Sequence, residues 1–170
     1  MYKRQVYGYL SIGGTFEVDY YLNSCSTNTK AKIGANNGEK LEKGQIIQLK
    51  NIKKILPKNK IEYLNSKIEN IRIIKGPHFD YFSKDAIDSF FSDEFNVTKL
   101  SDRMGIRLKG PKISNIKNTN IKSEGLVKGV IQITADGDPI IMLSDHGTIG
   151  GYPKIGVVIS ADYDKLVQIP

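Results

Sequence analysis

This 170-residue sequence has no long apolar run and only one cysteine. No apolar run approaches the roughly 18–20 residues that a membrane-spanning helix needs. Cys25 is the only cysteine, so no internal disulfide can form, and we expect a reducing compartment. The residues after Met1 are mixed and polar, unlike the apolar segment of a secretion signal. The sequence therefore predicts a cytoplasmic protein.

Several common catalytic patterns are also missing. The sequence has no Ser-His-Asp spacing, no phosphate-binding loop and no dinucleotide fingerprint. The two histidines, His78 and His146, lie far apart and have no flanking cysteines or paired carboxylates, so we predict no metal site. Cys25 has no His or Asn near it in sequence and is a poor candidate for a nucleophile.

The overall composition indicates a globular protein that can bury a hydrophobic core. Hydrophobic residues make up 39% of the chain, and the mean hydropathy is −0.32. The net charge is +7, and much of this excess lies in the lysine-rich stretch 50–60. That stretch lacks the arginines and interleaved aromatic residues that nucleic-acid recognition usually needs. We therefore interpret it as a solvated linker and expect no nucleic-acid partner.

The order of turns and apolar segments divides the chain into three parts. Residues 1–52, with strands expected at 5–12 and 45–49, are interpreted as the remnant of an N-terminal β subdomain. Residues 53–69 are the basic linker, which contains Pro57. Residues 70–170 form the C-terminal unit, and its first strand is expected at 70–75.

Within the C-terminal unit, one short helix is expected at 83–91. Ser83 can cap it, Asp85 lies near its positive end, and Ile87, Phe90 and Phe91 share one face that we expect in the core. A second helix start is indicated at 160–162 by Ser-Ala-Asp.

Strands and turns dominate the rest of this unit. The Asp136-Gly137 dipeptide lies between two apolar runs and predicts an antiparallel hairpin over 127–143. Pro139 lacks an amide hydrogen, so we expect its nitrogen to face a sheet edge or a bulge. Residues 155–159 are β-branched and apolar, which is typical of a core strand. Short strands with many glycine turns favour a mainly β fold built as a barrel.

The stretch 144–162 combines a polar cluster, two glycines and a stiff turn. Gly150 and Gly151 allow either a positive φ or a close approach to another segment. Pro153 restrains the backbone on both sides, so Tyr152 and Lys154 project from a rigid loop. Rigid polar loops often carry binding groups, although a plain tight turn between strands explains the same pattern.

Arg103 and Arg107, four residues apart, can hold a carboxylate through charge-assisted hydrogen bonds. A purely structural role is the alternative: Arg107 could pair with Glu124, and Asp136 could shape the hairpin turn. The candidate catalytic residues are Arg103, Arg107, Tyr152 and Lys154, and the candidate substrate-binding residues are Glu124, Gln132, Asp136, Asp145 and Thr148.

Blocks of residues in one order resemble a known family. They are 71–77, 101–111, 123–132, 136–143 and 150–162, the last of which begins Gly150-Gly-Tyr-Pro-Lys-Ile155; residues 8–14 with Ser26-Thr27 match more weakly. Together they resemble the biotin-dependent carboxyltransferase family, which includes the C subunit of bacterial 5-oxoprolinase, the proteins called allophanate hydrolase subunit 2, and part of the carboxyltransferase region of urea carboxylase. The chain is similar to the C-terminal half of that pattern.

The resemblance implies a cyclophilin-like β-barrel and a hydrolase or carboxyltransferase complex that acts on a cyclic amide or a urea-like substrate. It implies two partners, the kinase-inhibitor-like subunit of 5-oxoprolinase and its ATP-using subunit. No cofactor is expected on this chain itself; ATP on a partner protein, or carboxybiotin on a carrier, is implied instead. The expectation is that this chain alone is inactive.

One loop departs from the family pattern. His146-Gly147 stands where the family commonly has Arg-Gln, and Ile149 replaces a second Thr. We therefore expect that this loop changes either the substrate or the catalytic competence of the protein. Two further functions stay open at this point. One is a non-catalytic regulatory partner of a kinase-inhibitor-like protein, and the other is a structural fragment.

Overall fold

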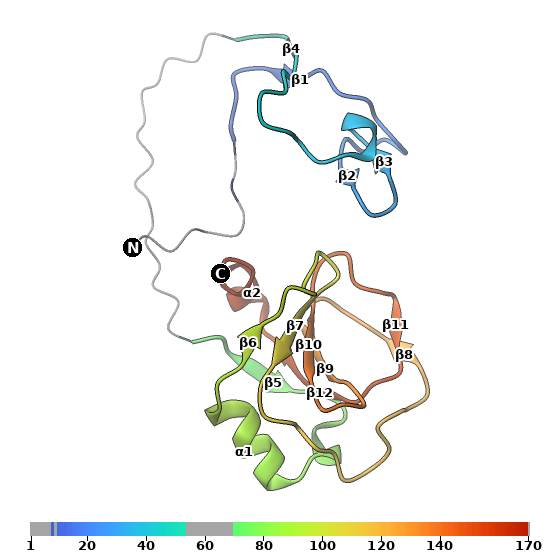
Figure 1. The fold of residues 1–170 in the computed structure, drawn as a ribbon, viewed down its shortest axis with the longest axis vertical. Helices are drawn as coiled ribbons and strands as arrows, with labels where there is room; N and C mark the ends of the chain where they lie inside the picture. Colours follow the sequence, from blue (N-terminus) through green and yellow to red (C-terminus); the bar gives the residue numbers. More distant parts are fainter. Residues whose placement is uncertain (1–7, 9, 54–69, 170) are drawn as a thin grey trace. The chain divides into compact units, whose positions relative to one another are not determined.

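The computed structural model describes residue 8 and residues 10–53 and 70–169 (Figure 1). The chain groups into two compact units, residues 9–65 and residues 66–170 together with 1–8. The predicted boundaries at 52 and 69 stay a prediction, because almost all of the predicted linker lies outside the described residues.

In the unit formed by residues 9–65, the described residues form only short elements. They are two antiparallel pairs and one 3-10 turn: β1 (Thr15–Phe16) with β4 (Leu49–Lys50), β2 (Thr27–Asn28) with β3 (Ile33–Gly34), and η1 (Asn36–Gly38). Most of its described side chains are exposed, and Leu22 and Ile46 are among them. Because few apolar side chains pack against one another here, each pair of strands matches only two residues on each side. The strand expected at 45–49 is therefore reduced to Leu49–Lys50. Of the strand expected at 5–12, residues 5–7 and 9 lie outside the described residues, and residues 8 and 10–12 form no strand.

The second unit is built on a six-stranded antiparallel sheet in the order β5-β12-β9-β10-β7-β6 (Figure 1). Its strands are β5 (Ile73–Lys75), β6 (Asn96–Val97), β7 (Gly105–Lys109), β9 (Val130–Ile133), β10 (Pro139–Met142) and β12 (Lys154–Val158). A separate two-stranded ribbon pairs β8 (Glu124–Gly125) with β11 (Ile149–Gly150). The expected mainly β fold is thus confirmed. Strands β5 and β6 end the order without pairing to each other within the described ranges, so closure of a barrel stays a prediction.

In the described part of this unit, three helical segments accompany the sheet. They are η2 (Phe79–Tyr81), α1 (Lys84–Ser92) and α2 (Ser160–Leu166). Helix α1 begins as its sequence predicts, because the Ser83 side chain accepts a hydrogen bond from the Ala86 amide at 3.2 Å. Across the described parts of the chain, every helix is too short or too polar to cross a membrane.

The two faces of the sheet differ in what covers them. Ile131, Ile133 and Ile141 point to one face, which we call the core face, where they pack with residues of α1 and α2. Alternate residues, including Val130 and Ile140, point to the opposite face, which we call the ribbon face, where Leu126 beside β8 packs on them. This alternation places polar side chains of the same strands on the ribbon face.

The hairpin predicted over 127–143 is present. Strands β9 and β10 pair with Ile133 opposite Pro139 and Ile131 opposite Ile141. At the tip, the Gly137 amide donates to the Thr134 carbonyl at 2.9 Å, and Gly137 has a φ of 78°. A positive φ is the reason that glycine is needed at this position.

Three local expectations are corrected by the packing. Phe91 is 58% exposed, because α1 has only nine residues and buries Ala86 while Ile87 and Phe90 pack partly against the core. The N-cap of α2 is Ile159, without a side-chain cap. Pro139 lies in the central strand β10, where it is tolerated as the first residue of the strand.

Candidate functional site

A buried lysine is the centre of the most polar part of the ribbon face. Lys154 begins β12, directly after Pro153, and its side chain is only 3% exposed. Its Nζ lies 2.9 Å from Oε2 of Glu124 on β8, whose side chain is 48% exposed. The hydrogen bond from Lys154 lowers the pKa of Glu124 below its ordinary value. A buried ammonium thus faces a carboxylate that solvent can reach.

Gln132 completes this cluster from the neighbouring strand. It pairs directly opposite Lys154 and is itself buried. Its Nε2 donates to the Tyr152 carbonyl at 3.1 Å. A Cβ on Gly150 would lie 2.6 Å from that same Nε2. Neither Gly150 nor Gly151 has a positive φ, so close approach is what glycine provides here.

The register places Arg107 on the same face as Lys154. Lys154 is opposite Gln132, Gln132 is opposite Ile140, and Ile140 is opposite Arg107. Directly opposite residues of an antiparallel pair point to one face, so these four form a row across β12, β9, β10 and β7. Strands are about 4.8 Å apart, which separates the ends of the row by roughly 14 Å before the long side chains are counted. The exposed guanidinium of Arg107 makes no ion pair or hydrogen bond with any described residue.

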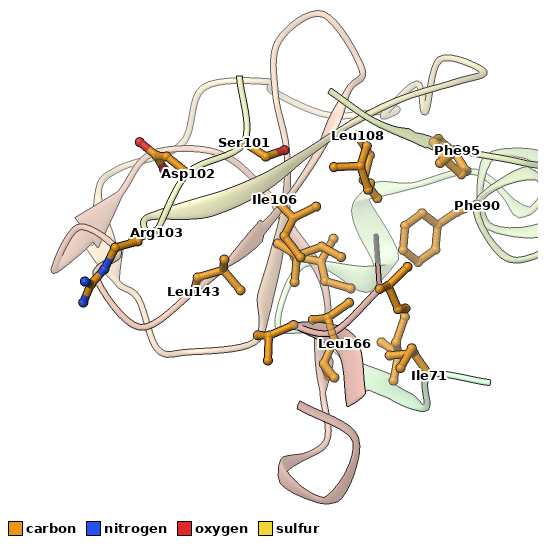
Figure 2. Close-up of a pocket in the computed structure, with 17 residues that line it drawn as sticks. Ile71, Phe90, Phe95, Ser101, Asp102, Arg103, Ile106, Leu108, Leu143 and Leu166 are labelled. Atoms are coloured by element: carbon orange, nitrogen blue, oxygen red, sulfur yellow. The ribbon is translucent and has the colours of Figure 1, made fainter. Parts of the chain in front are cut away.

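Arg103 does not join this row. Its Nε lies 2.8 Å from Oδ2 of Asp145, and the Asp145 amide donates to the Arg103 carbonyl. Figure 2 shows the Arg103 side chain pointing away from the apolar side chains around it. The two arginines that are four residues apart in sequence therefore have different surroundings in the fold.

Two of the other candidates, Asp136 and Thr148, make no hydrogen bond or ion pair with the Lys154 cluster within the described part of the chain. Asp136 is exposed at the tip of the β9–β10 hairpin. Thr148 is exposed, and its carbonyl accepts a hydrogen bond from the Leu126 amide at 2.9 Å. This bond links the residue after β8 to the residue before β11. Glu124 pairs with Lys154 and not with Arg107, which removes one structural alternative for that arginine. The roles of these residues stay predictions.

A large apolar cavity lies on the core face, away from the cluster (Figure 2). Its volume is about 550 Å³, and it is lined by aliphatic and aromatic residues such as Ile71, Phe90 and Leu108. Ser101, Asp102 and Arg103 are its polar residues. Acid–base or carboxyl chemistry needs polar groups that converge, and the Lys154 cluster provides them while the cavity does not.

His78 is the residue that sequence reasoning missed. It is 7% exposed, and its Nε2 lies 3.7 Å from Oε2 of Glu124. Burial lowers the pKa of His78 from its ordinary value; Glu124 opposes this effect and Lys154 adds to it. In the sequence, its position after Gly76-Pro77 indicated only a turn, since the contact is made across the fold. Among the described residues, no three His, Cys, Asp or Glu side chains are grouped so that they could hold a metal ion.

Comparisons with known proteins give a consistent result. The sequence profile of the family described as carboxyltransferase domain, subdomain A and B, matches residues 1–170. The chain is 32% identical to the C subunit of Escherichia coli 5-oxoprolinase, covering 99% of this chain and 55% of that protein. It is also 32% identical to the C subunit of Haemophilus influenzae 5-oxoprolinase, with 98% and 54% covered. This chain thus spans about half the length of these curated relatives.

Solved structures resemble the fold over nearly the whole chain. The crystal structure of the Kluyveromyces lactis urea carboxylase superposes with a TM-score of 0.72 at 27% identity, covering 94% of this chain and 16% of that one. The K. lactis urea amidolyase superposes with a TM-score of 0.77 at 28% identity, covering 94% and 11%.

Proposed function

This chain belongs to the carboxyltransferase domain family, subdomains A and B, and on that premise we propose that it works as part of a bacterial 5-oxoprolinase or a biotin-dependent carboxyltransferase-type complex. The substrate is a cyclic amide or a urea-like molecule. The observation that carries this proposal is the 32% identity to the C subunit of 5-oxoprolinase, which extends over 99% of this chain. The kinase-inhibitor-like and ATP-using subunits of 5-oxoprolinase are its partners.

The Lys154 cluster is the reaction site in this proposal. The Lys154 ammonium and the Gln132 amide are donors, and Arg107 adds a second positive charge on the same face. Donors of this kind stabilise negative charge that develops on a carbonyl or carboxylate oxygen. The accessible carboxylate of Glu124 can exchange a proton with the substrate. Burial of Lys154 keeps the ammonium in a weakly screened place, where its charge acts strongly.

The same donor set fits a carboxylate group delivered from outside the chain. Lys154 and Arg107 are cations, and Gln132 supplies an amide, so these residues would hold the carboxyl group of carboxybiotin on a carrier protein. When bound, that group supplies activated CO₂. ATP belongs on a partner protein, because the sequence carries no phosphate-binding motif.

The first test is catalysis by the assembled complex. This chain is co-expressed with the kinase-inhibitor-like and ATP-using partners, and ATP-dependent hydrolysis of 5-oxoproline is measured. We expect turnover by the complex and none by the 170-residue chain alone. A complex that assembles but leaves 5-oxoproline intact, while it carboxylates urea, would move the protein to the carboxyltransferase arm of the proposal. Loss of both activities in an assembled complex would contradict it.

Arg107→Ala tests the site directly. Because the Arg107 side chain is exposed and has no partner among described residues, its removal leaves the melting temperature unchanged. If it faces developing charge, kcat/KM falls by about 100-fold. Lys109→Ala is the matched control, since Lys109 follows on the same face of β7 but pairs with Asp138. A lowered melting temperature with unchanged activity would show that Arg107 only braces the fold.

A further inference from the structure

His78 connects two segments that carry the candidate site. It lies between Gly76 and η2, and it is buried against the start of β12. The His78 amide donates to the Lys154 carbonyl at 3.2 Å, and the Lys154 amide donates to Nδ1 of His78 at 3.3 Å. Both backbone polar groups of Lys154 are therefore bound by this one histidine.

The backbone around this contact is tightly packed. The Gly76 amide donates to the Ile155 carbonyl at 3.0 Å, and a Cβ on Gly76 would lie 2.3 Å from the Lys154 carbonyl oxygen. The Tyr81 ring meets the imidazole edge to face, with ring centroids 4.8 Å apart. The imidazole has little room to turn, so its two nitrogens have fixed neighbours.

These neighbours define the protonation state. Nδ1 accepts a hydrogen bond, so the single proton of a neutral imidazole resides on Nε2. Nε2 lies 3.7 Å from Oε2 of Glu124, the same oxygen that binds Lys154 Nζ. That distance is longer than a hydrogen bond, so the contact between Nε2 and the carboxylate is electrostatic. Among the described residues, the charged and titratable groups that face the ring are Glu124 from β8, Lys154 from β12 and Tyr81 from η2.

We infer that His78 is a positioning residue for Lys154. As a neutral imidazole protonated on Nε2, it fixes the backbone of Lys154 through Nδ1 and orients the Glu124 carboxylate through Nε2. The ammonium is thereby held in one place on the ribbon face, ready to meet the substrate. The catalytic part of this inference rests on the function proposed above, whereas the tautomer and the backbone contact do not.

Two amide substitutions separate the two ends of the imidazole. His78→Asn places a side-chain oxygen near the position of Nδ1, so it keeps an acceptor for the Lys154 amide. His78→Gln places its amide near Nε2 and loses that acceptor. Misplacement of a reacting group by about 1 Å costs about 100-fold in rate. In the assembled complex, we therefore expect kcat to fall by about 100-fold for His78→Gln, with KM little changed, and to fall by a clearly smaller factor for His78→Asn, which keeps the acceptor for the Lys154 amide but loses the Nε2 group beside Glu124.

Measurements that do not require enzyme turnover test the inference independently of the proposed activity. In the 170-residue chain, hydrogen exchange of the Lys154 amide is expected to stay slow in wild type and His78→Asn and to become fast in His78→Gln. Nitrogen NMR of wild type is expected to show a neutral ring protonated on Nε2 at neutral pH. Equal exchange in the two variants, or a ring protonated on Nδ1, overturns the inference even if the complex is active. The expected exchange pattern supports it even if the complex has no activity on 5-oxoproline.

Discussion

At the scale of single residues, the charged side chains that are buried in the described ranges all have partners of opposite charge. Lys154 is matched by Glu124, and Asp162 is fully buried against Arg72 and Lys165. No buried side-chain nitrogen or oxygen within the described ranges lacks a hydrogen-bond partner. A buried charge is costly when it loses a partner, so these pairs are sensitive positions.

Asp162 gives a pH-dependent prediction. It accepts from the Arg72 amide at 2.9 Å and from the Arg72 Nε at 2.7 Å, and these bonds hold the pKa of Asp162 well below its ordinary value. Because the unfolded chain then takes up the proton first, the stability from this carboxylate is present at neutral pH and is lost as pH falls from about 5. Asp162→Asn should lower the melting temperature at neutral pH and flatten its dependence on acid pH.

The control for this measurement is Asp164→Asn on the exposed side of α2. It should leave both the melting temperature and its pH dependence close to wild type. If Asp162→Asn keeps the acid dependence of wild type, the assignment to Asp162 is wrong.

At the scale of elements, the β8–β11 ribbon brings a carboxylate to a buried cation. Glu124 is opposite Gly150 in this ribbon, and Gly150 lies against the side chain of Gln132 on the main sheet. With no side chain at residue 150, the ribbon approaches this closely without displacing Gln132 or Leu126. The position of Glu124 beside Lys154 therefore depends on a glycine in the partner strand of the ribbon.

Gly150→Ala tests this dependence. The added methyl group would meet Nε2 of Gln132 at 2.6 Å and a Leu126 methyl group at 2.9 Å, so either these side chains or the ribbon must move. We expect a loss of about 1–3 kcal/mol in the free energy of unfolding, measured by urea denaturation. Gly125→Ala is a matched control on the other strand, since no atom lies within 4 Å of its added Cβ. Equal losses in the two variants would show that close approach at Gly150 is unimportant.

At the scale of the whole molecule, the core belongs to the unit that carries the site. The main cluster of buried apolar residues joins β9, β10 and β12 to both α-helices. Among the described residues of the unit 9–65, Ala35 is the only buried hydrophobic residue. The stability of the region around Lys154 is therefore set by packing behind the sheet, on the core face.

Ile131→Ala probes that packing. Ile131 is fully buried in the centre of the sheet, and truncation of such a side chain costs about 2–5 kcal/mol of unfolding free energy. Ile74→Ala is the comparison, because Ile74 is exposed on the edge strand β5 and should cost only about 0.5 kcal/mol. Thermal or urea unfolding measures both, and similar losses at the two positions would contradict this description of the core.

Local features of the fold could be predicted from the sequence alone. Asp136-Gly137 specified a hairpin because a tight turn needs a positive φ that glycine supplies at low cost, and Ser83 marked the start of α1 because its side chain binds a free amide of the first turn. Ordered blocks of residues over nearly the whole chain identified the family. Each of these signals lies within a few residues or depends on residue identity.

Contacts between distant segments were decided only by the tertiary structure. The register of β12 on β9 places Lys154 opposite Gln132, while the path of the loop after β5 brings His78 to a lysine 76 residues away. Arg103 and Arg107 show the same limit, since one pairs with Asp145 and the other joins the row with Lys154. Periodicity states which residues share a face of one strand. It does not state which strands become neighbours, because that depends on packing of the whole sheet.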